Sequence, residues 1–372
     1  MLQVLPRLEQ GGVERGTVEV AGALARAGWR AVVASAGGRM TAEIARAGAE
    51  HVALPLATKN PALMLLNARR LAGLIEARNI DIVHARSRAP AWSAMLAARR
   101  TGRPFVTTFH NAYGGESWLK RRYNSVMARG DRVIAISRFV AAHAAATYGV
   151  GEDRLRIIER GVDLDKFRPD RVAPSRIALL ARQWRLPDGV PVIMLPGRLT
   201  RWKGHAILIE ALRLHGRRDL VCLFLGAGRE RYRRALEGRI SAGKLAGEFR
   251  FVDHCDDMPA AYMLADVVVS ASTRPEGFGR VIAEALALGR PVIATDHGGG
   301  NEIVSPGVTG WLVPPHDAKA LAGALGEALA LGPEARASLA RAAMAAVAGR
   351  FSRDAMTQRT IAVYEEILGG AP

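Results

Sequence analysis

Residues 270–309 read SASTRPEGFGRVIAEALALGRPVIATDHGGGNEIVSPGVT and show the pattern that the rest of the chain repeats. A β-branched run ends at Ser270, and a Pro-Glu-Gly turn then leads into a helix. A second strand, residues 291–295, ends in the glycine turn 298–300. A strand, a helix and a strand at this spacing predict a parallel sheet covered by helices.

Two carboxylates in this segment predict a ligand site. Glu276 lies in the loop before the helix, where unpaired N–H groups and the positive end of the helix dipole gather. Glu284 lies about two turns further on, on nearly the same side of the helix. Gly277 and Gly279 allow a ligand to approach the backbone closely. These features favour a polyhydroxylated, phosphorylated ligand.

The same alternation fills the chain on both sides of this segment. Strands are predicted in the first half at 2–5, 30–34, 51–54, 80–84, 104–108, 132–136 and 156–158. Helices are predicted between them at 16–27, 41–47, 61–78, 91–100, 120–128 and 138–148. The second half has strand patterns at 190–195, 221–225, 249–252, 267–270, 292–294 and 310–313. Long helices follow at 318–349, and a last helix spans 355–368.

We therefore expect an α/β protein of two Rossmann-like α/β/α domains with a central cleft, and ligands at the C-terminal strand ends. The first domain is predicted at 1–165 and the second at 166–351. The last helix, about 352–372, is expected to pack back on the first domain. The stretch 163–189 contains three prolines and is predicted to be an interdomain connection.

Composition limits the class of protein. The chain has 372 residues, which is enough for two cores, and a mean hydropathy of +0.05. No apolar run approaches the roughly 20 residues of a membrane-spanning helix. The first residues lack the features of a signal peptide, which predicts a cytoplasmic protein. Cys222 and Cys255 have neither metal-ligand nor redox spacing and are expected to be free thiols.

The net charge of +17 is uneven: residues 1–180 hold 28 Lys and Arg against 15 Asp and Glu. Such an excess is typical of proteins that bind nucleic acid or an anionic membrane, or of an arginine-rich proteome. The segment 118–123 places Trp and Tyr among consecutive cations, as membrane-surface anchors do, although a solvated helix start is an equal alternative. No nucleic-acid recognition motif accompanies it.

Further motifs follow predicted strands. Arg198 and Lys203, in the turn that begins with Gly197, can reach a diphosphate. Gly11 and Gly12 stand between the first strand and the first helix, without dinucleotide-binding spacing. His110 ends a strand of the first half and is expected to face the cleft. The Asp-x-Asp at 163–165 lies away from these turns and is interpreted as chance, so no metal site is predicted.

Glu276, Glu284 and Glu302, with Arg198, Lys203, the Gly11-Gly12 loop and the segment 161–167, resemble the pattern of retaining GT-B glycosyltransferases. The closest resemblance is to family 4, and it covers nearly the whole chain. It implies a metal-independent enzyme of class EC 2.4 without a cofactor, which uses a UDP-, GDP- or ADP-sugar. Arg160 departs from the family, where Asn is frequent at this position.

The resemblance also implies a role for each matching residue. The catalytic set would be His110, Arg198, Lys203 and Glu276. Arg198 and Lys203, with Gly197, would hold the donor diphosphate, and Glu276 with Gly277, Phe278 and Gly279 would bind the transferred sugar. Glu284 would bind the ribose and His254 would edge the nucleobase. Gly12 would close over phosphate and acceptor, with Gly11, Glu14 and Asn111 on the acceptor side.

The Gly-Gly-Val-Glu-Arg stretch and the basic first half further resemble bacterial transferases that build lipopolysaccharide or other envelope glycans on lipid-linked acceptors. We therefore expect a peripheral protein on the inner face of the plasma membrane. The alternatives are a GT-B transferase with a soluble acceptor, a nucleotide-sugar epimerase, and a non-enzymatic basic protein that binds nucleotides or nucleic acid.

Overall fold

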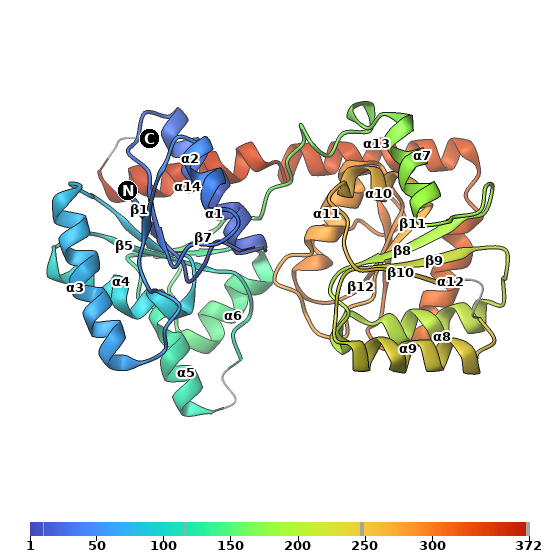
Figure 1. Cartoon of the computed structure of the whole chain (residues 1–372), viewed down its shortest axis with the longest axis horizontal. Coiled ribbons are helices and arrows are strands. Elements are labelled where there is room, and N and C mark those ends of the chain that lie inside the picture. Colours follow the sequence, from blue (N-terminus) through green and yellow to red (C-terminus); the bar gives the residue numbers. More distant parts are fainter. Residues whose placement is uncertain (10, 115–116, 246–248, 370–372) are drawn as a thin grey trace. The chain divides into compact units, whose positions relative to one another are not determined.

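The computed structural model describes residues 1–9, 11–114, 117–245 and 249–369, which fold into two compact units. Unit 1 comprises Met1–Gly161 and Arg353–Pro372, and unit 2 comprises Val162–Ser352 (Figure 1). The end of the predicted segment 352–372, residues 370–372, lies outside the described residues.

Unit 1 contains a seven-stranded parallel sheet in the order β3-β2-β1-β4-β5-β6-β7. Its strands are β1 (Leu2–Val4), β2 (Val32–Ser35), β3 (Glu50–Ala53), β4 (Val83–Ala85), β5 (Phe105–Phe109), β6 (Arg132–Ala135) and β7 (Leu155–Ile157). Its helices are α1 (Gly12–Arg26), α2 (Thr41–Arg46), α3 (Pro61–Ala77), α4 (Arg88–Arg100), α5 (Trp118–Asn124), η1 (Ser125–Ala128), α6 (Arg138–Tyr148) and α14 (Arg353–Ile367).

Unit 2 contains a six-stranded parallel sheet in the order β10-β9-β8-β11-β12-β13. Its strands are β8 (Val192–Pro196), β9 (Val221–Leu225), β10 (Phe249–Val252), β11 (Val267–Ser270), β12 (Val292–Thr295) and β13 (Gly310–Val313). Its α-helices are α7 (Pro174–Gln183), α8 (His205–His215), α9 (Glu230–Ala242), α10 (Met258–Leu264), α11 (Arg280–Ala287), α12 (Ala318–Leu329) and α13 (Pro333–Arg350). Short 3₁₀ turns are η2 (Pro169–Arg171), η3 (Arg201–Lys203) and η5 (Gly298–Gly300).

The two sheets share one topology, which confirms the predicted doubly wound α/β class. In each unit the chain starts at a central strand, builds outward to one edge, and then crosses back to build the other side. The point of reversal lies between β1 and β4 in unit 1, and between β8 and β11 in unit 2. In open α/β sheets, ligands bind at the carboxyl ends of the strands beside this reversal.

Helices cover both faces of each sheet, so the central strands are buried on both sides, whereas the edge strands β3, β7 and β10 are only partly buried. In unit 2, α8, α9 and α12 form one layer, and α7, α10, α11 and α13 form the other (Figure 1). The core of unit 2 joins residues from strands and helices, among them Ile193, Leu208, Phe224, Val269 and Leu325.

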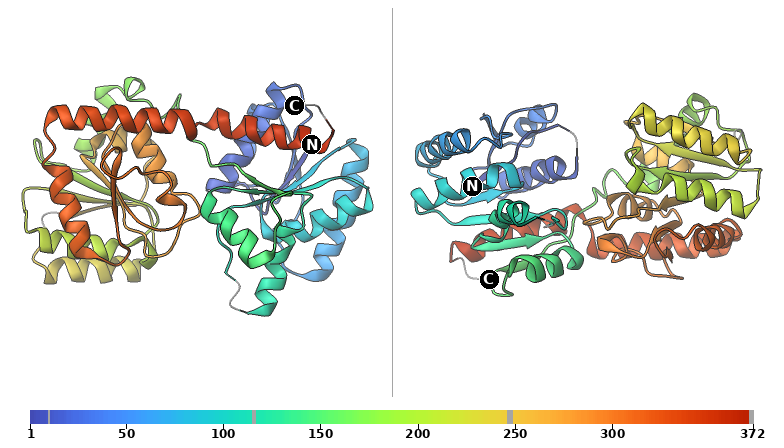
Figure 2. Two further views of the ribbon diagram at one scale, coloured as in Figure 1. Left: turned by 180° about the vertical axis from the view of Figure 1, so that it is seen from behind. Right: turned by 90° about the horizontal axis from the view of Figure 1, so that it is seen from below.

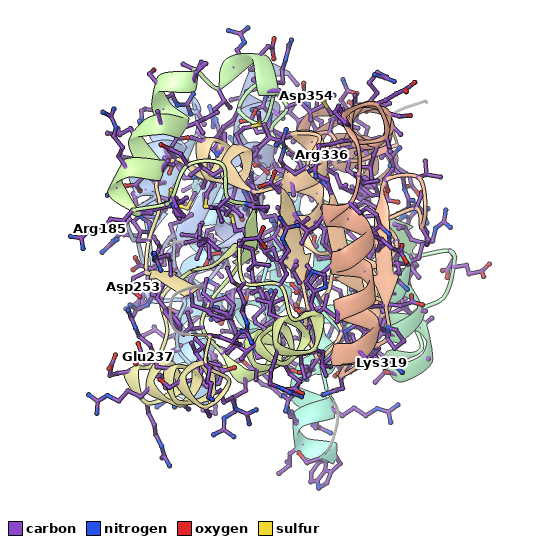
Figure 3. The ribbon with its side chains drawn as sticks, turned by 90° about the vertical axis from the view of Figure 1, so that its right-hand side faces the viewer. Arg185, Glu237, Asp253, Lys319, Arg336 and Asp354 are labelled. Atoms are coloured by element: carbon purple, nitrogen blue, oxygen red, sulfur yellow. The ribbon has the colours of Figure 1, made fainter. Side chains whose placement is uncertain are left out.

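Charged side chains on the outer helices of unit 2 either bond to the sheet or lie exposed at the surface. Arg336 of α13 donates a hydrogen bond to the Asp266 carbonyl at 3.0 Å, at the start of β11 (Figure 3). Arg185, Glu237 and Lys319 are exposed, and Figure 3 shows Arg185 and Glu237 at one edge of the view.

The stretch 163–189 is more than the connection that its prolines predicted. It contains α7, which begins at Pro174 and packs against α10. Arg176 of α7 pairs with both oxygens of Asp257, at 2.7 and 2.6 Å, and Asp257 also caps α10. Pro174 stands at the first position of α7, where a proline is compatible with a helix, so its presence was misread as a break.

Helix α14 belongs to unit 1, where it lies against α1 (Figure 2). Its Tyr364 hydroxyl lies 2.6 Å from Nδ1 of His84 on β4, and Nε2 of His84 lies 2.7 Å from the Thr108 hydroxyl on β5. All three side chains are buried, and burial lowers the pKa of His84 well below its usual value. The neutral imidazole therefore has both nitrogens satisfied, one of them by a residue 280 positions away.

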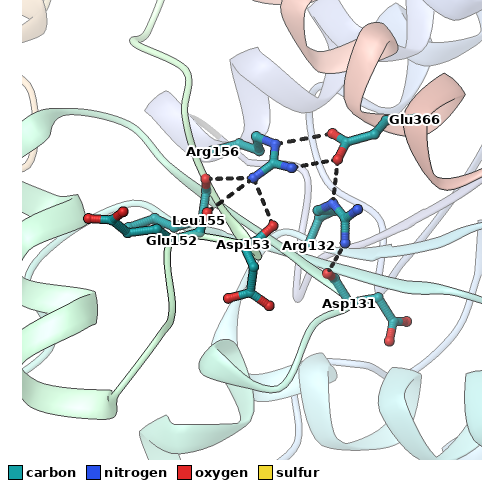
Figure 4. A network of polar contacts seen from close by, with 7 residues as sticks. All are labelled: Asp131, Arg132, Glu152, Asp153, Leu155, Arg156 and Glu366. Atoms are coloured by element: carbon teal, nitrogen blue, oxygen red, sulfur yellow. Dashed lines mark hydrogen bonds and ion pairs between the residues drawn. The ribbon is translucent and has the colours of Figure 1, made fainter.

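A second contact fixes α14 near the β6–β7 edge of the sheet. Glu366 accepts from Arg132 Nε of β6 at 2.8 Å and from Arg156 Nε of β7 at 3.1 Å (Figure 4). The hydrogen bond from Arg156 lowers the pKa of the Glu366 carboxyl. These side chains are about one third exposed, so solvent weakens their pairing.

Replacing Tyr364 with Phe is expected to destabilise unit 1 by about 1–3 kcal/mol, because it leaves a nitrogen of buried His84 without a partner. Glu366→Gln, the matched change on the same helix, should cost less than about 1 kcal/mol, because that pair is exposed. Urea unfolding of the full chain measures both effects. Equal destabilisation by the two variants would contradict this account.

Candidate functional site

Two strand-end turns meet beside the reversal point of unit 2. The turn 197–204 follows β8 and ends in η3, and the loop 271–279 follows β11. Gly204 has φ +79°, and a Cβ there would lie 1.8 Å from the Ala271 carbonyl oxygen. Only glycine permits so close a backbone approach in this conformation. The Thr273 N–H also donates to the Trp202 carbonyl at 2.7 Å, which joins the two turns a second time.

This approach brings Lys203 and Glu276 together, two residues that the sequence predicted for one site. Lys203 Nζ lies 2.8 Å from Glu276 Oε1, and the Ser272 hydroxyl donates to the same oxygen. The two charged side chains are only 13% and 18% exposed. Lys203 Nζ also lies 4.6 Å from the centre of the Trp202 ring, and the Lys203 side chain lies beside Gly197. The pair is therefore more than a surface ion pair, because much of its solvent has been removed.

The glycine turn 298–300 supports the Glu276 loop from behind. The Gly299 N–H donates to the Glu276 carbonyl at 2.8 Å. A Cβ on Gly298, which has φ +71°, would lie 2.8 Å from the Glu276 backbone nitrogen. A pocket opens between this turn and the Glu276 loop, lined by Ser270, Ser272, Glu276, Gly279, Ile282, Thr295, His297 and Gly300. The glycines thus position the loop.

Glu284 lies within α11 and is buried. Its Oε2 accepts from the Tyr262 hydroxyl at 3.0 Å, and its Oε1 accepts from Arg280 Nε at 2.7 Å. Tyr262 is fully buried, and desolvation together with the Glu284 charge raises its pKa well above the usual value. Tyr262 therefore acts as a neutral donor that orients the carboxylate. Each carboxylate oxygen has two lone pairs, so a ligand hydroxyl can still bind there.

The helices that begin at this site have no side-chain cap. Gly204 and Gly279 stand at the N-caps of α8 and α11, both with left-handed φ and without a side-chain hydrogen bond. By contrast, Asp317 caps α12 and Asp257 caps α10. First-turn N–H groups that no side chain caps suit an anionic ligand.

The remaining residues predicted for the donor side lie near the same edge of the sheet. Arg198 directly follows Gly197 and is exposed. Gly277 and Phe278 are buried within the Glu276 loop. His254 follows β10, is 59% exposed and lies 2.8 Å from Asp256. Gly226 packs its backbone against Gly197, where a Cβ would lie 2.4 Å from the carbonyl oxygen, so this glycine is needed for the packing of the two turns.

The site residues predicted in the first half, which are the acceptor-side residues together with Gly12 and His110, lie at the strand ends of unit 1. Gly11 is the N-cap of α1 and Gly12 its first residue, without a side-chain cap. Glu14 folds back over Gly11. His110 follows β5, and its Nε2 is buried without a hydrogen-bond partner among the described residues. Asn111 is exposed and accepts from the Ala112 N–H at 2.9 Å.

The Asp-x-Asp at 163–165 has a local role in the structure. Asp163 Oδ1 accepts from the backbone N–H groups of Asp165 and Lys166 at 3.1 and 3.3 Å, which is a turn stabilised by its own side chain.

Several site residues were missed by the sequence reasoning. Arg280 stands four residues before Glu284 on one helix, a spacing that predicts an ion pair and could have been used. Tyr262 and Ser272 have no such signal. His297 lies two residues after the end of β12, and its Nε2 is 2.7 Å from the Ser272 carbonyl oxygen. Its position at a strand end could have identified it as a site residue.

Comparison with known proteins identifies the class. The family model for Glycosyltransferase Family 4 matches residues 10–166, and that for Glycosyl transferases group 1 matches residues 177–345. A D-inositol 3-phosphate glycosyltransferase of Salinispora tropica is 33% identical over 317 residues, which are 78% of this chain. The chain spans 64% of the length of that relative.

Solved structures give the same result. A glycosyltransferase of Rickettsia africae is 37% identical, with a TM-score of 0.92 over 100% of this chain and 98% of that one. HepE of Anabaena in complex with UDP-glucose has 24% identity and a TM-score of 0.86, and the match covers 98% of this chain and 99% of that one; it shows the shared fold.

The paired parallel sheets and these matches define a glycosyltransferase of the GT-B fold, an enzyme of class EC 2.4 that uses a nucleotide-sugar donor. The chain belongs to glycosyltransferase family 4, as its motifs predicted. Membership of this family excludes two of the alternatives that the sequence left open, a nucleotide-sugar epimerase and a non-enzymatic basic protein.

Gly204→Ala is expected to disrupt the meeting of the two turns. Gly189→Ala is the matched control, because Gly189 has a similar φ of +70° but no atom within 4 Å of the new Cβ. Both variants carry backbone strain of about 1–3 kcal/mol, and the clash at Gly204 should add about 2 kcal/mol or more. Thermal and urea unfolding of the full chain measure the difference. Equal stability of the two variants would show that the close approach is unimportant.

Proposed function

We propose that this protein transfers a sugar, with retention of anomeric configuration and without a metal, from a nucleotide-diphosphate sugar to a lipid-linked or glycan acceptor of the cell envelope. Unit 2 binds the donor. The observation that carries this proposal is the Lys203–Glu276 pair, held where two strand-end turns meet beside the reversal point of the sheet.

The donor diphosphate binds at the turn 197–204. Lys203 supplies a partly buried positive charge, and Arg198 adds an exposed guanidinium that can bind two phosphate oxygens at once. The N-termini of α8 and α11, which no side chain caps, add backbone donors. These groups act where negative charge develops as the diphosphate departs, which is the arrangement that lowers a barrier most effectively.

The transferred sugar binds at Glu276. Within the described part of the chain, Lys203 and Ser272 both donate to Oε1 of this carboxylate, so Oε2 can accept from sugar hydroxyls. Gly277, Phe278 and Gly279 follow it and bring backbone N–H groups close to the ligand. Glu284, held by Tyr262, binds the ribose hydroxyls, and His254 lies beside the nucleobase.

In the reaction, the bond between the anomeric carbon and the diphosphate oxygen breaks, and its electron pair leaves with the diphosphate. The acceptor hydroxyl forms the new bond on the same face of the sugar, and its proton passes to the departing phosphate oxygen. Lys203 and Arg198 stabilise the diphosphate charge throughout. In unit 1, Gly12 with Gly11, Glu14 and Asn111 contributes to the acceptor side.

A surface on unit 1 supports a lipid-linked acceptor. Leu63, Leu65 and Leu66 of α3 are 45%, 59% and 39% exposed, and Trp118 and Leu119 of α5 are 71% and 62% exposed. Three consecutive cations, Lys120 to Arg122, follow on α5. Exposed Trp and Leu beside cations suit the headgroup region of an anionic membrane. No helix in the described part of the chain is long and apolar enough to cross a membrane.

Nucleotide binding tests the donor site. Thermal unfolding in the presence of EDTA and of UDP, GDP or ADP should show stabilisation by one nucleotide. Lys203→Ala should weaken the binding of that nucleotide by about tenfold or more, because a hydrogen bond to a charged group is lost. UDP is the first nucleotide to test, because HepE binds UDP-glucose in its crystal structure. If no nucleotide stabilises the protein, or only with a metal, the proposed donor site is wrong.

Cosedimentation with anionic phosphatidylglycerol vesicles tests the membrane surface. The double variant Trp118→Ser/Leu119→Ser should bind at least about tenfold more weakly, because it removes about 2–4 kcal/mol of apolar burial. Leu179→Ser is the matched control, since Leu179 is 60% exposed but lies on α7 of unit 2. Absence of wild-type binding at low salt, where attraction is strongest, would favour a transferase with a soluble acceptor.

A further inference from the structure

Unit 1 has its own cluster of basic side chains, two guanidinium groups and an imidazole, beside its reversal point. Arg86 directly follows β4, His110 directly follows β5, and Arg160 lies shortly after β7. These three residues line one pocket together with Thr108 and Thr360. We call them the Arg86 cluster. Arg86 was not singled out by the sequence, and the departure at Arg160 had no explanation there.

Arg86 is a buried cation with an unused donor. Its side chain is 3% exposed, and its Nε has no hydrogen-bond partner in the part of the chain that the structure describes. Burial lowers its pKa, while the Tyr364 hydroxyl and the Glu19 carboxyl raise it. A guanidinium still keeps its proton in a protein. An unpaired donor on a buried cation is costly, and a bound anion would remove that cost.

His110 supplies a neutral hydrogen-bonding group. Burial, with the Arg160 and Arg86 charges, lowers the pKa of its imidazole well below the usual value, which keeps the ring neutral. A neutral imidazole has one N–H donor and one acceptor nitrogen. Its Nε2 is buried and has no partner among the described residues.

Arg160 lies against the first turns of α1. A Cβ on Gly16 would lie 2.4 Å from its Nη1, and a Cβ on Gly12 would lie 3.3 Å from its Nη2. The two glycines therefore make room for the guanidinium at a helix start. The pocket lining that the structure describes includes no carboxylate. Arg160 thus adds a second positive charge beside Arg86, where the Glu19 carboxyl supplies one negative charge.

We propose that the Arg86 cluster binds an oxyanion, phosphate or carboxylate, that neighbours a hydroxyl on the acceptor substrate. Arg86 Nε donates to the anionic oxygen, Arg160 contributes charge, and His110 Nε2 forms a hydrogen bond with the hydroxyl. The assignment to the acceptor rests on the proposed function, because the donor diphosphate already has Lys203 and Arg198 in unit 2.

Inorganic phosphate is the probe, and Lys203→Ala is the parent, in which the donor site of unit 2 binds phosphate more weakly. Thermal unfolding is followed against phosphate concentration at constant ionic strength. Arg86→Lys keeps the charge but removes the Nε donor, and Arg160→Gln removes the second charge. Arg100→Gln, on an exposed position of α4, is the control.

Phosphate should raise the melting temperature of the parent and of the Arg100→Gln control. Its dissociation constant should rise about tenfold or more in Arg86→Lys, because a hydrogen bond to a charged group is lost. If Arg86→Lys fails to fold, the phosphate affinity of Arg160→Gln tests the proposal instead. Unchanged phosphate affinity in the folded variants, or no phosphate response in the parent, would overturn the proposal.

A second arm separates acceptor from donor. In the chain with Lys203 intact, saturating nucleotide should leave phosphate binding at the Arg86 cluster unchanged. Competition between nucleotide and phosphate there would place the donor diphosphate at Arg86 and overturn the acceptor assignment. Failure of every nucleotide to bind would count against the proposed function alone, because the phosphate titration of the Lys203→Ala parent does not depend on it.

Discussion

The site of unit 2 depends on one close backbone contact, between Gly204 and the Ala271 carbonyl. Two strands that are neighbours in the sheet end in turns of different sequence, and only the absence of a side chain at Gly204 lets those turns touch. Lys203 and Glu276 are adjacent as a result, although 73 residues separate them. The glycine turn 298–300 then closes the other side of the Glu276 loop. The chemistry of the site is therefore set by backbone packing before any side chain is considered.

The two units use one topology for different chemistry. In each sheet the polar groups gather at the carboxyl ends of the strands beside the reversal point. Unit 2 places a cation and a carboxylate there, with glycine N-caps on two helices. Unit 1 places two guanidinium groups and an imidazole there. Similar folds thus present surfaces of different charge, because only the residues that follow each strand differ.

Much of this structure was predictable because parallel strands buried on both faces have apolar, β-branched sequences that stand out between helices. All thirteen strands in the described residues match predicted runs, with ends that differ by a few residues. Helix α7 was missed because Pro174 was interpreted as a break. The Lys203–Glu276 neighbourhood followed from strand ends, whereas Tyr262 and the environment of Arg86 did not. Partners that a fold brings together from distant, unpatterned positions leave no local periodicity to detect.

The path of the chain has a consequence for biosynthesis. Unit 2 is formed by one uninterrupted segment, whereas unit 1 needs α14, which follows unit 2 in the chain. His84 is synthesised early, yet its partner Tyr364 emerges 280 residues later. During translation the first sheet must therefore wait with a polar imidazole exposed on a face that α14 later covers. Unit 2 can complete its core before α14 is available to unit 1. This differs from the usual order, in which the N-terminal domain finishes folding before the next domain.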